Sequence, residues 1–97
     1  MIKKIRYGNK TIKLPFEVAI PASPNERNKL ETVTNPYSGA IASLPVFAVA
    51  VYDVIKGSEV IASQNFGPVA EDAAKTMQKG LSWFQKYFTD EYGVLLD

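Results

Sequence analysis

Apolar and less apolar residues alternate with a period of two near the N-terminus. The apolar positions are Ile12, Leu14, Phe16, Val18 and Ile20. A period of two places all these side chains on one face of a strand, so residues 11–20 predict a half-buried β-strand. Pro15 has no N–H to donate to a neighbouring strand, which indicates a sheet edge or a bulge at that position.

The residues before this strand predict its partner. Gly8-Asn9 is typical of a two-residue hairpin turn, and residues 2–7 then form the first strand. Such a turn fixes the register, so that Tyr7 faces Lys10, Arg6 faces Thr11, Ile5 faces Ile12 and Lys4 faces Lys13. One face of the hairpin then carries Ile5, Tyr7, Ile12 and Leu14, and the other carries Lys4, Arg6, Thr11 and Lys13.

Turn-forming residues divide the next part of the chain. Residues 21–29 are a loop by composition, with one helical turn predicted to begin at Pro24. Residues 30–34 predict a third strand, and residues 40–44 predict a fourth short strand. Between them, Asn35-Pro36-Tyr37-Ser38-Gly39 predicts a turn, because proline fixes φ and glycine accepts a positive φ.

Residues 46–62 are compatible with two secondary structures. Helical spacing connects Phe47, Ala48, Val51, Val54 and Ile55. The same stretch is rich in β-branched residues, so it is also compatible with a buried strand that turns at residues 56–59. We favour the helix. In either case we expect the segment to be interior, because Asp53 is its only charged residue before Lys56.

The most regular helical pattern covers residues 69–88. Its apolar face consists of Ala70, Ala74, Met77, Leu81, Phe84 and Phe88, widened by Ala73, Gly80, Trp83 and Tyr87. We expect Met77, Leu81 and Phe84 to be buried. Glycine inside a helix costs about 1 kcal/mol relative to alanine, so a neighbouring element is predicted to pack closely on Gly80. The apolar residues 92–97 are expected to dock on the core.

These elements predict an α+β fold, in which N-terminal antiparallel β-hairpins pack against one or two C-terminal helices. A chain of 97 residues is within the size range of one domain, so we expect residues 1–97 to form a single domain. The hydrophobic fraction of 46% is typical of a chain with a folded core.

The side-chain inventory excludes several kinds of catalysis. The chain has no cysteine and no histidine, which excludes disulfides, thiolate metal sites and nucleophiles activated by histidine. We therefore expect a protein that is not an enzyme, with no catalytic residue, no metal and no cofactor. The remaining enzyme hypothesis is carboxylate chemistry, with Asp53 or Asp72 holding a hard metal ion.

Location is predicted from two absences in the sequence. The charges at the N-terminus are not followed by an apolar run, and no stretch approaches the ~18 apolar residues of a membrane span. We expect no signal peptide, no contact with a membrane and a cytoplasmic location.

Positive charge is concentrated near the N-terminus, and it gives the first candidate site. On the exposed hairpin face, Lys4, Arg6 and Lys13 are spaced to follow a phosphate backbone, so nucleic-acid binding is an alternative hypothesis. Tyr7 and Phe16 fall on the opposite face, where they cannot stack on bases, and edge lysines also deter aggregation. The C-terminal half has more acids than bases and is not expected to add a second basic surface.

Two further groups of residues favour structural roles. A second cationic stripe on the last helix, made of Lys75, Lys79, Ser82 and Lys86, is interpreted as a solvated helix face. Trp83 and its aromatic neighbours are assigned to the core, with Trp83 or Tyr87 showing an edge.

Asp53, within an apolar stretch, has two interpretations. It is either a cap or the partner of a buried lysine, or it is a site with a perturbed pKa.

Parts of the last two-thirds of the chain resemble known sequences. The fragments are Asn35-Pro36-Tyr37-Ser38-Gly39, Ala50-Val51-Tyr52-Asp53-Val54-Ile55, Lys79-Gly80-Leu81-Ser82-Trp83-Phe84 and the ending Tyr92-Gly93-Val94-Leu95-Leu96-Asp97. Their combination resembles small uncharacterised proteins of bacteriophages and aquatic metagenomes. The resemblance implies a phage origin and a helix around Tyr52, and it brings no catalytic or binding residue with it.

The preferred functional hypothesis is a small non-enzymatic interaction or accessory protein. It rests on the missing catalytic side chains and on an apolar surplus for a short chain. The partner is another protein or a second copy, and the strand interrupted by Pro15 favours a homodimer, since two-fold dimers are the commonest assembly. Nucleic acid is the less favoured partner.

Overall fold

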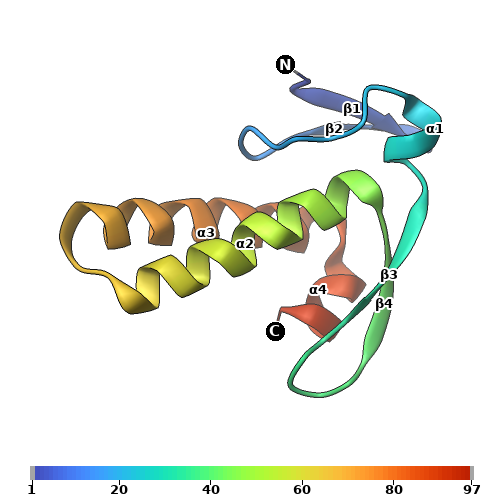
Figure 1. Cartoon of the computed structure of the whole chain (residues 1–97). Helices are drawn as coiled ribbons and strands as arrows, with labels where there is room; N and C mark the ends of the chain where they lie inside the picture. Colours follow the sequence, from blue (N-terminus) through green and yellow to red (C-terminus); the bar gives the residue numbers. More distant parts are fainter. Residues whose placement is uncertain (1, 97) are drawn as a thin grey trace.

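The computed structural model describes residues 2–96 and has the predicted α+β fold. In chain order its elements are β1 (Lys4–Tyr7), β2 (Lys10–Lys13), α1 (Pro24–Arg27), β3 (Leu30–Thr34), β4 (Ile41–Pro45), α2 (Val46–Gln64), α3 (Gly67–Tyr87) and α4 (Thr89–Leu95). Two separate antiparallel sheets pair β1 with β2 and β3 with β4. Figure 1 shows α2 and α3 side by side as a helical hairpin whose connecting turn lies away from both sheets and from α4.

The β1–β2 hairpin has the predicted register. Lys4 pairs with Lys13, Ile5 with Ile12, Arg6 with Thr11 and Tyr7 with Lys10. Gly8 has a φ of 60°, which suits glycine in a two-residue hairpin turn. Ile5 and Ile12 are each 1% exposed, whereas Lys4, Arg6 and Lys13 are exposed on the other face. The sequence therefore predicted both faces correctly.

The second strand is shorter than predicted. β2 ends at Lys13 instead of continuing to residue 20. Leu14 still donates its backbone N–H to the carbonyl oxygen of Lys3 at 2.9 Å, but Pro15 has no N–H and the pairing ends there. Leu14 and Val18 are nevertheless buried, at 7% exposed each. The alternation thus predicted the inward-facing residues correctly and the strand length incorrectly.

The β3–β4 hairpin also forms, with β4 beginning at Ile41, one residue later than predicted. In its turn, the Asn35 side-chain oxygen accepts a hydrogen bond from the backbone N–H of Tyr37 at 2.9 Å. The Asn35 side-chain amide donates to the carbonyl oxygen of Val94 at 2.9 Å. One side chain therefore shapes the turn and ties it to the C-terminal segment.

Residues 46–64 form a single helix, α2, so the favoured alternative is correct. Its buried residues are Phe47, Ala48, Val51, Tyr52, Ile55 and Ser58. They recur every three or four positions, so a helix gathers them on one stripe. Asp53 lies off this stripe and is exposed. The expectation that the whole segment is interior is therefore wrong.

The packing of α2 on α3 is closest at Gly80, as predicted. A Cβ atom at Gly80 would lie 2.8 Å from Cδ1 of Ile55, so only glycine lets the two helices approach this far. Phe84, one turn later, is 0% exposed. Met77 and Leu81 are half-buried rather than buried, because they lie beside this line of contact and not on it.

The buried side chains form one cluster that includes residues from β1, β2, β4, α2, α3 and α4. Trp83 packs within it, with ring centroids 5.1 Å from Phe84 and 5.4 Å from Phe88. At 5% exposed, Trp83 is a core residue, as predicted. The C-terminal segment docks as expected up to Leu96, with Leu95 2% exposed, and Asp97 lies outside the described residues. Most of the segment belongs to the helix α4, which the sequence pattern did not predict.

Candidate functional site

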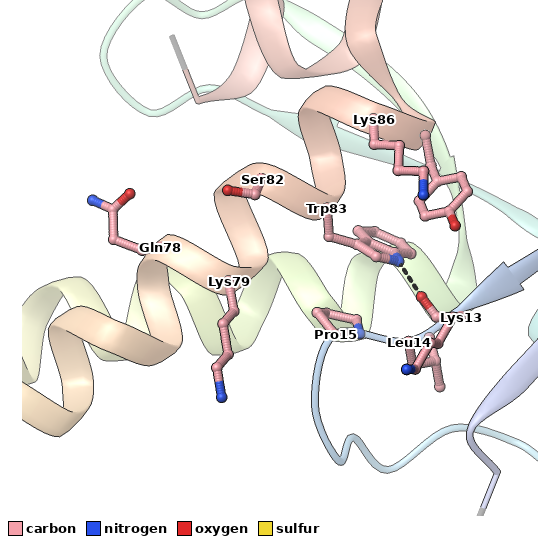
Figure 2. Close-up of a pocket in the computed structure, with 9 residues that line it drawn as sticks. Lys13, Leu14, Pro15, Gln78, Lys79, Ser82, Trp83 and Lys86 are labelled. Carbon is pink, nitrogen blue, oxygen red and sulfur yellow. Dashed lines mark hydrogen bonds between the residues drawn. The ribbon is translucent and has the colours of Figure 1, made fainter.

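An open groove of about 570 Å³ lies where the chain leaves β2 and crosses the second half of α3 (Figure 2). The lining residues are Lys13, Leu14, Pro15, Gln78, Lys79, Ser82, Trp83, Lys86 and Tyr87. This volume is within the range of ligand pockets in proteins. The groove is the candidate functional site, and we call it the lysine groove.

One hydrogen bond holds the two walls of the lysine groove together. The indole Nε1 of Trp83 donates to the backbone carbonyl oxygen of Lys13 at 2.8 Å, as the dashed line in Figure 2 marks. The Trp83 ring is buried and the bond is partly buried, which reduces the competition from water. Pro15 ends the strand just beyond this point, and Phe16 then lies against α3 at Gly80. The shortened strand is therefore part of what forms the groove.

Three cations surround an apolar floor in the lysine groove. Lys13 comes from the end of β2, and Lys79 and Lys86 come from α3; all three are exposed. None of the nine lining residues is acidic. Within residues 2–96, the one ion pair joins Lys56 and Glu59 at 3.6 Å, so the three groove lysines are not neutralised by a carboxylate. The groove consequently favours a negatively charged ligand.

Lys86 also interacts with the aromatic wall. Its Nζ lies 5.1 Å from the centroid of the Tyr87 ring, a distance at which a cation is attracted to the face of the ring. This contact holds a positive charge beside the half-buried Tyr87 ring. An occupant that combines a carboxylate with an apolar side chain would match both features. Ser82, the only hydroxyl nucleophile besides Tyr87 in the lining, has no histidine or carboxylate beside it to activate it.

The structure brings together two cationic groups that the sequence analysis treated separately. Lys79, Ser82 and Lys86 of the second stripe line the same groove as Lys13 of the hairpin, whereas Lys75 does not. The expectation that the C-terminal half adds no second basic surface is therefore wrong. No sequence signal could have identified the groove, because Lys13 and Trp83 are 70 positions apart.

The candidate nucleic-acid residues Lys4, Arg6 and Lys13 share the outer hairpin face, as expected. Of these, only Lys13 lines the groove. The rings near them face inward. Tyr7 packs edge-on against Phe47, with centroids 5.3 Å apart. The cationic hairpin face therefore presents no aromatic ring on which a base could stack.

Asp53 does not form the buried pair that was one hypothesis. Its side chain lies on the exposed side of α2, and the structure gives it no ion pair within the described residues. Desolvation by partial burial raises the pKa of Asp53 above 3.8, and the negative charge of Glu31 raises it further. Among residues 2–96 there is also no cluster of three or more potential metal ligands of the His, Cys, Asp and Glu types.

A second cavity, of about 390 Å³, lies between α2, α3, the C-terminal segment and the β3–β4 turn. Lys56 is its only basic residue, and this charge already has partners. Lys56 Nζ pairs with Glu59 and lies 5.7 Å and 5.8 Å from the ring centroids of Tyr37 and Tyr52. The lysine groove is the better candidate because its charges have no carboxylate partner.

Comparison with known proteins adds no relative. The chain matches no protein-family model, no curated protein and no solved structure. Across residues 2–96, none of the helices combines the length and the apolar character needed to cross a membrane.

Proposed function

We propose that this is a small non-enzymatic interaction protein and that the lysine groove binds an acidic segment of a protein partner. The observation that carries the proposal is the convergence of Lys13, Lys79 and Lys86, from two distant parts of the chain, around an apolar floor. A cytoplasmic location and a phage origin stay predictions from the sequence.

The shape and chemistry of the groove favour a peptide segment over an isolated small anion. A small anion would contact the lysines but leave the apolar floor of Leu14, Pro15 and Trp83 unused. An extended or helical segment with acidic and apolar side chains would use both, because apolar burial provides affinity and opposite charges provide orientation and faster association.

Nucleic acid is the second candidate, because Lys4, Arg6 and Lys13 lie on one exposed face. Phosphate contacts by three cations would give weak binding whose affinity falls steeply with salt, with a log–log slope of about −0.7 to −0.9 per contact. Sequence recognition would require side chains at base edges or exposed rings. Trp83 and Tyr7 are held in the aromatic cluster instead.

Fluorescence anisotropy with labelled peptides tests the proposal. The probe is a short peptide in which Glu and Asp alternate with Phe and Leu, and its control has Gln and Asn in place of the acids. We expect the acidic peptide to bind, the neutral one to bind at least about tenfold more weakly, and added salt to reduce the difference.

Matched variants locate the binding site. Lys79→Glu with Lys86→Glu should abolish peptide binding, whereas Lys4→Glu with Arg6→Glu changes the net charge equally but lies outside the groove and should leave it nearly unchanged. The opposite ranking of the two variants would refute the groove as the site. A dissociation constant for DNA or RNA below about 1 μM at physiological salt, lost in Lys4→Glu with Arg6→Glu, would establish the nucleic-acid alternative instead.

A further inference from the structure

The chain itself carries an acidic and apolar segment of the kind that the lysine groove favours. It comprises the turn between α2 and α3 and the first turns of α3, at the end of the helical hairpin that no other element covers (Figure 1). Phe66 in this turn is 95% exposed and Val69 is 57% exposed. Glu71 and Asp72 follow directly and are exposed too. We call residues 66–72 the acidic tip.

The acidic tip and the lysine groove lie at opposite ends of one helix face. The exposed residues along this face of α3 are Glu71, Asp72, Lys75, Lys79, Ser82 and Lys86. Glu71, Lys75, Lys79, Ser82 and Lys86 recur at three- and four-residue intervals, so they share the side of α3 away from the buried Ala73, Gly80 and Phe84, and Asp72 borders this side. The acids Glu71 and Asp72 lie at the start of this face, and its lysines follow from Lys75 onward.

Within one chain, these opposite charges do not meet. Glu71 and Lys75 are spaced for an i,i+4 pair, but the ion pair between Lys56 and Glu59 is the one that the structure gives among residues 2–96. The acids and the lysines of α3 are therefore free to interact with another molecule.

We propose that two copies of the chain pair antiparallel along α3, so that the acidic tip of each copy occupies the lysine groove of the other. The inference rests on the proposed function, because it identifies a second copy as the partner that supplies the acidic segment. A dimer of this kind has two-fold symmetry, and each copy contributes the same surface to the interface.

The charge pattern favours only one of the two pairing directions. If the two helices cross between Lys75 and Thr76, Asp72 of one copy lies level with Lys79 of the other. Phe66 then lies level with Gln85, between the Ser82 and Lys86 positions of the groove. Parallel pairing would place all the lysines against lysines and the acids against acids, whereas the antiparallel crossing brings only the two Lys75 side chains close together; like charges in contact are unfavourable.

The length of the contact suits a stable dimer. α3 has 21 residues, which at 1.5 Å per residue gives a contact line roughly 30 Å long. The exposed Phe66 supplies a large apolar side chain to one end of the contact, and the apolar floor of Leu14, Pro15 and Trp83 receives it. The two-fold axis lies near the middle of this line, so each half of it pairs the tip of one copy with the groove of the other.

Charge reversal provides a test that depends on the antiparallel arrangement. In Lys79→Glu with Lys86→Glu the α3 face becomes mostly acidic, and in Glu71→Lys with Asp72→Lys it becomes entirely basic. In either variant alone, the dissociation constant of the dimer should rise roughly tenfold or more. An equimolar mixture should regain a dimer with one copy of each variant, because every tip then faces a groove of opposite charge.

The measurements are light scattering and analytical ultracentrifugation across the micromolar range. For the wild type we expect twice the monomer mass at high micromolar concentration and a weaker dimer at high salt. Phe66→Ala should weaken the dimer, whereas Ile41→Ala, which alters an exposed apolar residue of β4 outside the groove and the acidic tip, should not. Circular dichroism confirms that each variant folds, and all four altered α3 side chains are exposed.

The outcomes separate this inference from the proposed function. A wild type that stays monomeric at high micromolar concentration, or a dimer unaffected by charge reversal, overturns the antiparallel dimer. If the monomeric wild type still binds the acidic peptide and Lys79→Glu with Lys86→Glu abolishes that binding, the groove binds another protein and only the dimer is wrong. Masses larger than a dimer in the mixture of variants would indicate head-to-tail chains and would also overturn it.

Discussion

The two ends of the α2–α3 hairpin place phenylalanine side chains in opposite environments. Phe84 near one end is 0% exposed, and Phe66 at the other end is 95% exposed. The difference follows from the layout in Figure 1, where both sheets and α4 lie around the end at which α2 begins and α3 ends. One end of the hairpin packs into the core and stabilises the fold, and the other is a free end exposed to solvent.

The largest expected difference is between two separate variants in which one of these phenylalanines is replaced by alanine. Phe84→Ala should lower the free energy of unfolding by about 3–5 kcal/mol, because it leaves a cavity in the aromatic cluster. Phe66→Ala should change it by less than about 0.5 kcal/mol, because the ring is almost fully exposed. Urea denaturation of dilute protein measures both values. Equal losses in the two variants would contradict the division of the hairpin into a stable end and a free end.

A second, smaller contrast uses two helical glycines. Gly80→Ala should destabilise the protein by about 1–3 kcal/mol, because the new methyl group overlaps the side chain of Ile55. Gly57→Ala in α2 has no atom within 4 Å of the new Cβ, so it should stabilise the helix by up to about 1 kcal/mol. Thermal denaturation of both variants would show melting temperatures that move in opposite directions. A stabilising Gly80→Ala would mean that the helices are less closely packed there.

The smallest effect concerns Asp53 on the outer side of α2. Burial first, and the charge of Glu31 second, raise the pKa of Asp53 above 3.8 in the folded state. The folded state then binds the proton more tightly than the unfolded state. Protonated Asp53 therefore favours the folded state at low pH, and this contribution to the free energy of unfolding is lost as the pH rises through the raised pKa. Asp53→Asn should therefore gain stability relative to the wild type as pH rises through this window.

Denaturation at several pH values measures this difference. Glu31→Gln should reproduce part of the effect, because it removes the second cause of the raised pKa and leaves the first. A stability difference between wild type and Asp53→Asn that does not vary with pH would contradict the raised pKa.

Local patterns predicted most of the fold. The Gly8-Asn9 turn defined the β1–β2 register residue by residue, because a two-residue loop leaves no freedom in the pairing. The helical spacing in residues 69–88 predicted α3, and in residues 46–62 it favoured the helix α2 over a strand. Alternation failed only in the length of β2, since burial on one side of an irregular segment produces the same pattern as a strand.

The candidate site could not be predicted in the same way. Each of its parts was visible in the sequence, as the hairpin lysines and as the stripe on the last helix. Their meeting depends on the hydrogen bond between Trp83 and the Lys13 backbone, which joins residues 70 positions apart. The half-burial of Met77 and Leu81 was missed for a related reason, because the line on which α2 approaches α3 is determined by Gly80 and Ile55 together.

The most direct test of the account follows the indole N–H of Trp83 by NMR while the acidic peptide is added. Trp83 is the only tryptophan in the chain, so its indole signal is unambiguous, and it lies in the wall of the lysine groove. We predict that this signal and the backbone signals of Lys13, Lys79 and Lys86 shift progressively with the acidic peptide and not with its neutral control. Two results would contradict the assignment of the groove as the binding site. One is a set of shifts confined to Lys4 and Arg6 on the hairpin face, and the other is the absence of shifts at both surfaces.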